Sequence, residues 1–442
     1  MKKLLSILLV AVLILSVLPA ASAETATAAD ITKDTAISGS GYSGFGFLSD
    51  GDIKTYHKSS GNTTITLENA AGIHSLYLMF DLEYGEYTIT DNTTGKSITA
   101  GQHRFLHEYI ALESPATSLT IRFENGAVRL SELYAFSEGS APDFVQTWDA
   151  PLDGKADIVL FATHGDDDQL FFAGLMPYYA GEVGCALQVV YLTDHRNLTM
   201  ARTHEMLNGL WAVGVKAYPV FGEFDDFRID DLQQTYSAYK NLGHPKEQLQ
   251  GFVVEQIRRF KPQVAIGHDL KGEYGHGMHM VYADLLAEAL EISNDASYYP
   301  ELAEQYGLWD VPKAYVHLYE ENPIVMDWDT PMEELNGMTP FEVTQEFGFP
   351  CHVSQRGTWF NRWIYGGGTI TKASQIVVAF SKPAVVHYDH IHTVLDGFVT
   401  KVDEDVFVNF KVASFPGIEY NRALLKRIAR NDSIANKLMH IA

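Results

Sequence analysis

Short runs in which apolar and polar residues alternate fill the first third of the chain, from residue 31 to about residue 136. Runs at 63–67, 75–80, 87–90 and 119–123 are separated by segments rich in Gly, Asn and Asp. Alternation with a period of two puts every second side chain on the same face of a β-strand. Several short strands divided by turn residues are typical of an all-β sandwich, so we expect one here.

From residue 148 onward, continuous apolar runs alternate with segments of helical periodicity. The sequence predicts buried strands at 158–162, 185–193, 217–221 and 264–267. It predicts helices around Arg202, from Leu249 to Phe260, and after Met280. Alternation of strands and helices favours an α/β fold, with a parallel Rossmann-like sheet covered by helices on both faces. The small and polar residues 137–147 are typical of a linker between the two parts.

The two ends of the chain carry further segments. Lys2 and Lys3, an apolar run at 4–18 and a small-residue site ending at Ala23 have the three parts of a secretory signal peptide. The run is shorter than the roughly 20 apolar residues of a membrane-spanning helix, so we expect cleavage and a secreted, extracellular or periplasmic protein without a membrane anchor. The predicted organisation is a signal peptide at 1–23, the sandwich at 31–136, the linker, an α/β domain at 148–372 and a β-rich extension at 373–442. The extension ends in an amphipathic helix within residues 421–439, which is expected to dock on the domain.

Net charge limits the partners. The 442 residues carry a formal charge of −24, and loss of the two lysines of the signal peptide would make it −26. Such a surface disfavours nucleic acid, polyanionic glycans and anionic lipid, and a neutral or cationic substrate fits better. The two cysteines do not form a disulfide framework. Cys185 opens a predicted buried strand and is expected in the core, while its pairing with Cys351 stays open.

Candidate chemistry follows the strand predicted at 158–162. The residues Thr163 to Asp168 read THGDDD, and ligands of parallel α/β folds bind beyond the carboxyl ends of the strands. His164 and Asp167 can wrap one divalent cation, which leaves Asp166 free as a base toward metal-bound water. The turn lacks the glycine pattern of a dinucleotide site, and its carboxylates would repel phosphate.

A third ligand is expected from His276 and His279, which follow the strand at 264–267. Each piece alone has a simpler explanation. Acidic residues are common in solvated loops and in the first turn of a helix, and a chain with 17 histidines contains closely spaced pairs without function. The position of both pieces at strand ends favours the metal site.

Four blocks in order resemble the LmbE-like or PIG-L family of metal-dependent N-deacetylases. They are THGDDD at 163–168, Arg202-Thr203-His204-Glu205, Gly275-His276-Gly277-Met278-His279, and His352-Val353-Ser354-Gln355. The resemblance implies a fold of the LmbE type and a metal, zinc or alternatively iron. It implies the metal ligands His164, Asp167 and His279.

The same resemblance implies the other roles. Asp166 is the implied general base, His276 faces the oxyanion or protonates the leaving amine, and Tyr274 polarises the substrate carbonyl. Weaker candidates for substrate contacts are Arg202, which is equally well read as an ion-pair partner of Glu205, and Asp225 or Asp226. Three residues depart from the family pattern: Gly165 replaces a proline, Asp168 a glutamate and Met278 an aspartate.

The first third resembles discoidin or galactose-binding jelly-roll modules. The resemblance rests on residues 47–56 and 128–134. Such modules bind glycans or pack against a neighbouring domain, and a calcium ion at Asp50 is a weak expectation.

The expected function is a secreted zinc-dependent N-deacetylase that acts on the acetamide of an N-acetylated amino sugar in a glycan or glycoconjugate. Two alternatives remain. One is a glycan-binding protein whose metal domain has decayed, and the other is a metal-dependent phosphoesterase, which would commonly use two metals and more carboxylates.

Overall fold

The computed structural model describes residues 26–40, 45–59, 61–194, 200–317, 324–325, 330–353 and 379–381. The chain forms two compact units, Met1–Gln146 and Thr147–Ala442, and the division falls at the end of the predicted linker. The signal peptide, the terminal amphipathic helix and all of the predicted β-rich extension except residues 379–381 lie outside the described residues. No helix in the described part is long and apolar enough to cross a bilayer.

The first unit is an antiparallel β-sandwich, as predicted. Its strands are β1 (Ala36–Ser40), β2 (His57–Ser59), β3 (Thr63–Phe80), β4 (Tyr87–Asp91), β5 (Ser97–Ala100), β6 (His107–Phe123) and β7 (Val128–Phe136), with short 3-10 turns at Thr32–Asp34 and Phe45–Ser49. The spatial order is β2-β7-β3-β6-β4-β5, and β1 also pairs with β3.

Two long strands, β3 and β6, belong to both halves of the sandwich. The first half of β3 pairs with β1 and its second half with β7, and the register shifts between Glu68 and Ile73. Gly72 lies in this irregular stretch at φ 91°, a conformation that glycine adopts without strain. The runs predicted as separate strands at 63–67 and 75–80 are therefore two halves of one strand.

The second unit contains the predicted α/β sheet. Its strands are β8 (Ile158–Ala162), β9 (Leu187–Thr193), β10 (Val220–Phe224), β11 (Val264–Gly267), β12 (Lys313–His317), β13 (Ile324–Val325) and β14 (Ala379–Ser381). They lie in the order β10-β9-β8-β11-β12-β14-β13; the first five are parallel, and β14 is antiparallel to both of its neighbours. Every residue of β8 and β9 is buried, as expected for central parallel strands covered on both faces.

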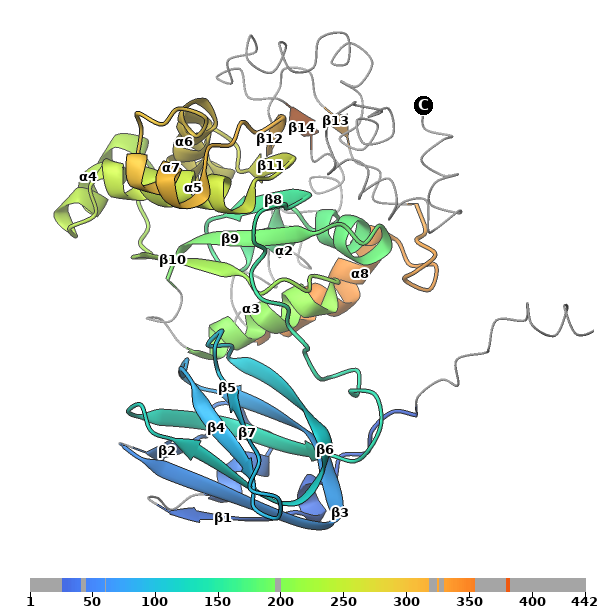
Figure 1. Ribbon diagram of the computed structural model, residues 1–442. Coiled ribbons are helices and arrows are strands. Elements are labelled where there is room, and N and C mark those ends of the chain that lie inside the picture. Colours follow the sequence, from blue (N-terminus) through green and yellow to red (C-terminus); the bar gives the residue numbers. More distant parts are fainter. Residues whose placement is uncertain are drawn as a thin grey trace, which may run out of the picture. The chain divides into compact units, whose positions relative to one another are not determined.

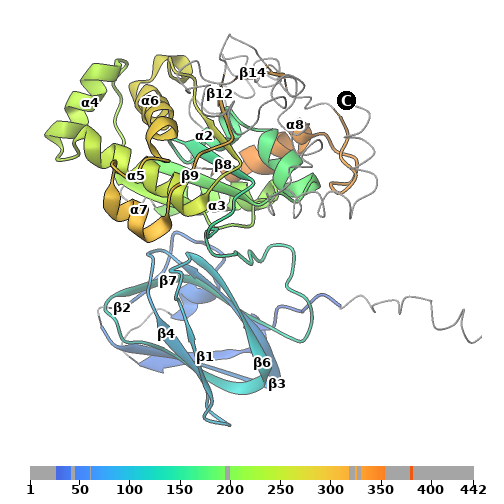
Figure 2. The same cartoon turned by 45° about the horizontal axis from the view of Figure 1, so that its top comes forward.

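Helices cover the sheet. The described helices are α2 (Asp167–Leu170), α3 (Met200–Ala212), α4 (Leu232–Asn241), α5 (Lys246–Phe260), α6 (Gly277–Ile292), α7 (Pro300–Tyr306) and α8 (Pro340–Val343), with shorter turns at Pro177–Glu182, Glu273–Gly275, Thr344–Gly348 and Phe349–Cys351. Helices α4 to α7 lie together on one face, whereas α3 and α8 lie on the other (Figure 1). Figure 2 shows the same grouping of α4 to α7 after rotation. Apolar residues of α5 and α6 form one core with β8, β9 and β11.

The strand order places the candidate site. The chain runs from β8 outward to β9 and β10, and then returns to add β11 and β12 on the other side of β8. The order therefore reverses between β8 and β11, and the carboxyl ends of two such strands form the crevice where α/β sheets bind ligands.

Several elements differ from the sequence predictions. Strand β10 begins after Pro219 instead of at residue 217, because Ala217 pairs with Asp149 and proline has no N–H for a ladder. The helix after the THGDDD segment has only four residues. Helix α6 begins at Gly277, so that His279 lies on a helix and not in a loop. The prediction for Cys185 is confirmed, because it is buried, and Cys185 and Cys351 are not joined in a disulfide.

Candidate active site

The segment after β8 forms a tight turn closed by one of its own carboxylates. Asp167 Oδ2 accepts a hydrogen bond from the backbone N–H of His164 at 2.8 Å, and the backbone N–H of Asp167 donates to the His164 carbonyl at 3.2 Å. Helix α2 starts here, with Asp166 as its N-cap residue. The turn directs His164 and Asp167 to the same place.

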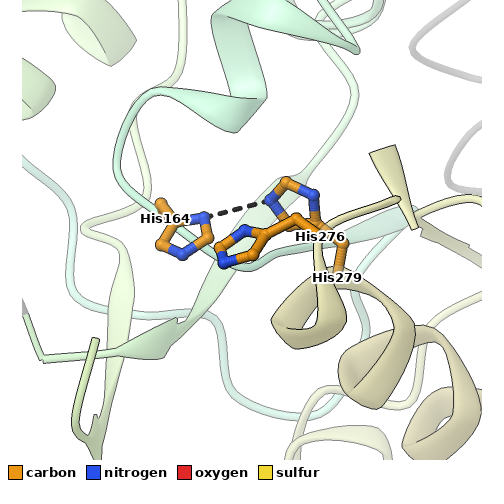
Figure 3. Close-up of side chains that lie close together, drawn as sticks. All are labelled: His164, His276 and His279. Atoms are coloured by element: carbon orange, nitrogen blue, oxygen red, sulfur yellow. Dashed lines mark hydrogen bonds between the residues drawn. The ribbon is translucent and has the colours of Figure 1, made fainter. Parts of the chain in front are cut away.

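The three metal ligands implied by the resemblance come together. His164 Nδ1 lies 3.1 Å from Asp167 Oδ2, and His279 Nε2 lies 3.1 Å from each of these atoms. Figure 3 shows the contact between the two histidines as a dashed line. Ligand atoms about 2.0–2.1 Å from a tetrahedral zinc are separated by roughly 3.3 Å. This arrangement, the ligand triangle of His164, Asp167 and His279, therefore has the size of one face of a zinc site.

The charges of the ligand triangle also fit a cation. Burial alone would lower the pKa of His164, but the Asp167 carboxylate, together with Asp226, raises it to about 10. Burial would raise the pKa of Asp167, but the charges of His279 and His164 hold it well below its usual value. Two imidazole nitrogens and a carboxylate oxygen this close need a proton or a metal ion among them.

Two further sets of metal-binding groups overlap the triangle: His164, His276 and His279, and Asp167, His268 and His279. His268 Nε2 lies 3.4 Å from Asp167 Oδ2, but it accepts a hydrogen bond from the backbone N–H of Thr163 at 3.0 Å. That bond occupies the lone pair with which His268 would bind a metal. Of the two sets that contain Asp167, the ligand triangle is therefore the better metal site.

The remaining acid of the turn, Asp166, pairs with Arg202 of α3. Arg202 NH2 lies 3.2 Å from Asp166 Oδ2, and both side chains are largely buried. His352 is buried in the same electrostatic neighbourhood: burial lowers its pKa to about 4, with opposing effects of Asp166 and Arg202. The sequence alternatives for Arg202, a sugar contact or a pair with Glu205, did not include this contact with the implied base.

His276 lies against the triangle as a neutral imidazole. Its ring stacks on His164, with centroids 5.2 Å apart, and its Nε2 lies 3.3 Å from the Phe227 carbonyl. A carbonyl only accepts, so Nε2 carries the proton. His276 Nδ1 is buried and has no hydrogen-bond partner among the described residues. Burial, aided by His164 and His279, lowers the pKa of His276 to about 4.

Tyr274 stands at the edge of the site in a strained backbone conformation. Its φ is 46°, in the left-handed region that non-glycine residues seldom adopt. The ring stacks on His276 with centroids 5.8 Å apart and is 40% exposed. Burial of the hydroxyl, followed by the charges of Asp167 and Asp166, raises the pKa of Tyr274, so the hydroxyl remains a donor at neutral pH.

Met278 occupies the place of the family's aspartate and is fully buried in the core. Its Sδ accepts a hydrogen bond from the Phe227 N–H at 3.3 Å, and the carbonyl of the same Phe227 faces His276. A neutral backbone carbonyl thus contacts His276, and Met278 holds the segment that carries it.

The acidic pair before Phe227 divides between two histidines. Asp226 Oδ1 lies 3.4 Å from His164 Nε2, whereas Asp225 Oδ2 lies 3.5 Å from His244 Nε2. Asp226 thus contacts the outer nitrogen of His164, the implied metal ligand, and such contacts commonly orient a ligand. The sugar contacts assigned to Asp225 and Asp226 stay predictions.

Asp168 points away from the triangle. It accepts a hydrogen bond from Gln169 Nε2 at 2.9 Å, and burial raises its pKa to about 7, partly offset by Tyr191 and Gln169. The Asp168 side chain therefore has a hydrogen-bond partner of its own, and the replacement of the family's glutamate by aspartate leaves the triangle intact.

In the first unit, calcium was expected at Asp50, and Glu132 lies beside this residue. Asp50 accepts hydrogen bonds from the Asp52 N–H at 2.9 Å and the Thr55 hydroxyl at 2.8 Å. Glu132 is 1% exposed, and burial, followed by Asp50, raises its pKa to about 7. Calcium binding there stays a prediction.

Sequence reasoning did not identify His268, Glu273 and His317, which surround the triangle. His268 and His317 sit at the carboxyl ends of β11 and β12. A polar residue immediately after a predicted buried strand was the available signal for His268. His317 had no such signal, because its strand was not predicted.

Comparison with known proteins gives a match over part of the second unit. Residues 159–290 match the family model described as PIG-L, GlcNAc-PI de-N-acetylase. The 1D-myo-inositol 2-acetamido-2-deoxy-alpha-D-glucopyranoside deacetylase of Streptomyces avermitilis is 26% identical over 216 residues, which cover 42% of this chain and 65% of that relative. The chain thus spans less than two thirds of the length of this relative.

Two solved structures show more distant similarity. The N,N'-diacetylchitobiose deacetylase from Pyrococcus horikoshii is 16% identical, with 53% of this chain and 86% of that chain covered and a TM-score of 0.35. CBM32-3 from a family 31 glycoside hydrolase of Clostridium perfringens is 17% identical, with 25% of this chain and 95% of that chain covered and a TM-score of 0.21. The family assignment comes from the family model: residues 159–290 form a domain of the GlcNAc-PI de-N-acetylase (PIG-L) family.

Proposed function

We propose that the protein is a metal-dependent deacetylase that hydrolyses the acetamide of an N-acetylated amino sugar. The observation that carries the proposal is the ligand triangle, in which two imidazole nitrogens and one carboxylate oxygen lie 3.1 Å apart. The family domain that contains it and the printed name of the Streptomyces avermitilis relative support the substrate class.

The donor set favours zinc, with iron as the alternative, and three protein ligands leave a position for water. Such an ion, when bound, polarises the substrate carbonyl and makes its water a nucleophile at neutral pH. Asp166 is the base that takes a proton from the attacking water, and Arg202 holds its carboxylate in place.

His276 and Tyr274 serve the other side of the reaction. Tyr274 keeps its hydroxyl proton and donates a hydrogen bond to the developing oxyanion. His276 is neutral at rest, so the proton that its Nδ1 gives to the leaving amine as the C–N bond breaks is the one that Asp166 has taken from the attacking water and passed on. Water thus supplies the hydroxyl of acetate and, in net terms, the proton of the free amine.

Secretion and the charge of the substrate also belong to the proposed function. The signal-like segment at 1–23 supports secretion, and the strongly negative charge supports a neutral or cationic substrate such as an N-acetylated glycan or glycoconjugate. The triangle contains a single carboxylate, which favours one metal ion over the two of a typical phosphoesterase.

The direct test is an acetate-release assay on N-acetylglucosamine oligomers and N-acetylglucosaminyl glycolipids, with a phosphate-ester substrate in parallel. We expect acetate release that a chelator abolishes and added zinc restores. Phosphate release without acetate would support the phosphoesterase. Glycan binding by an intact, metal-free protein without either activity would support the binding-protein alternative.

A further inference from the structure

A buried carboxylate, Glu273, lies behind the ligand triangle and has no assigned role in the reaction. It is 3% exposed and belongs to the short turn between β11 and α6. One of its oxygens, Oε1, accepts hydrogen bonds from His317 Nδ1 at 2.7 Å, from His268 Nδ1 at 3.3 Å and from the backbone N–H of Asp269 at 3.3 Å. Two histidine side chains therefore converge on one oxygen.

Hydrogen bonds fix the orientation of His268 in this cluster. Its Nε2 accepts from the Thr163 N–H at 3.0 Å, so its proton resides on Nδ1 and points to Glu273. Thr163 immediately precedes the metal ligand His164. His268 therefore connects Glu273 to the backbone that carries His164.

Glu273 also reaches the ligand His279 by two routes. Its backbone carbonyl lies 3.4 Å from His279 Nδ1, which places the proton on Nδ1 and leaves Nε2 free for the metal. The ring of His268, held by the Glu273 carboxylate, lies flat against the ring of His279, with centroids 4.4 Å and planes 16° apart. One route fixes the tautomer of the ligand, and the other fixes the plane of its ring.

The cluster joins three neighbouring strands. Thr163 follows β8, His268 follows β11, and His317 ends β12, and these strands are adjacent in the sheet. Burial of a carboxylate is costly unless it is hydrogen-bonded, and replacing a buried ionic group with apolar residues often costs no stability. The arrangement therefore points to a role beyond stability.

We propose that Glu273 is a positioning residue: anchored by His317, it holds His279 and the end of β8, through His268 and its own backbone carbonyl, in the geometry that binds the metal. This inference rests on the proposed metal-dependent function. It adds that metal affinity depends on a carboxylate that does not touch the metal.

The test compares Glu273→Gln with the wild type. Zinc affinity is measured by competition with a chromophoric chelator, and site geometry by the visible absorption of the cobalt(II)-loaded protein. We expect zinc binding to weaken by about 10- to 100-fold, the usual effect of removing a partner of a metal ligand, together with a changed cobalt spectrum. Glu182→Gln is the matched control, because Glu182 is also buried but accepts hydrogen bonds from the backbone of 333 and 334.

If Glu273 has only a structural role, Glu273→Gln would lower the thermal midpoint of the metal-free protein but leave its zinc affinity and the cobalt spectrum unchanged. That result would overturn the inference. If Glu273→Gln does not fold, His317→Phe removes one hydrogen bond to the carboxylate and His317→Gln keeps a donor; zinc affinity should fall in the first and recover in the second. Equal affinity in the two His317 variants would also overturn it, whereas a wild type that binds no zinc would refute the proposed function itself.

Discussion

The substitution Asp166→Asn tests the assignment of the base. It removes the proton-accepting charge and leaves the ligand triangle unchanged, because Asp166 contributes no atom to it. The expected loss in kcat is about 10²- to 10⁴-fold, the usual contribution of a general base. At 1.36 kcal/mol for each factor of ten, this loss corresponds to roughly 2.7–5.4 kcal/mol of transition-state stabilisation.

The same substitution has a separate effect on stability, because Arg202 loses its anionic partner. The Asp166 side chain is 4% exposed and that of Arg202 is 19% exposed. Loss of a fully buried pair costs about 3–5 kcal/mol, and the partial exposure of Arg202 reduces the expected cost to roughly 1–3 kcal/mol. Activity must therefore be measured well below the thermal midpoint of the variant.

The assay is acetate release under saturating substrate, with metal content determined on the same sample. Asp168→Asn is the matched control, because it makes the same chemical change in the adjacent buried acid, which faces Gln169. We expect both variants to retain the metal and only Asp166→Asn to lose turnover. Full turnover in a metal-loaded Asp166→Asn would refute its role as the base.

Three further outcomes are expected. The metal-free protein should lose stability as pH rises from about 6.5 through 10, because the pKa of His164 is raised to about 10 and only the protonated imidazole stabilises the fold. Thermal midpoints measured against pH, with and without zinc, check this. A midpoint of the metal-free protein that does not change with pH would contradict it. Met278→Asp should cost about 2–5 kcal/mol of unfolding free energy because the site is buried, whereas Met278→Leu should cost less than about 1.5; equal costs in denaturant melts would speak against burial. Residues 148–442 alone should release acetate from a small soluble substrate, because all proposed catalytic residues lie within them; a folded fragment that has lost its metal would disprove this.

The sequence predicted the architecture where local pattern and burial agree. Strands β8 and β11 begin and end at the predicted residues, because continuous apolar runs of this kind occur in strands buried on both faces. Strand β12 escaped prediction, because Lys313 and His317 at its ends gave the run a polar character, although both residues are buried. Their burial depends on tertiary contacts that the local pattern does not contain.

Prediction of the site had a similar limit. Motif order assigned His164, Asp167 and His279 as ligands, because the resemblance carries residue types at fixed positions, and the structure brings these three side chains together. It did not reveal that Arg202 pairs with Asp166 or that Glu273 lies between two histidines. The contacts of Arg202 with Asp166 and of His317 with Glu273 join segments far apart in the chain, and the strand order brings these segments together.

The proposed function requires that His164, Asp167 and His279 hold one catalytic metal ion. The most direct measurement is metal content by elemental analysis, paired with acetate release, for the wild type, His279→Ala and His164→Ala. We expect about one zinc or iron per wild-type chain, and loss of both metal and acetate release in each folded variant. Two metals per chain, or full metal content and activity in His279→Ala, would contradict the claim.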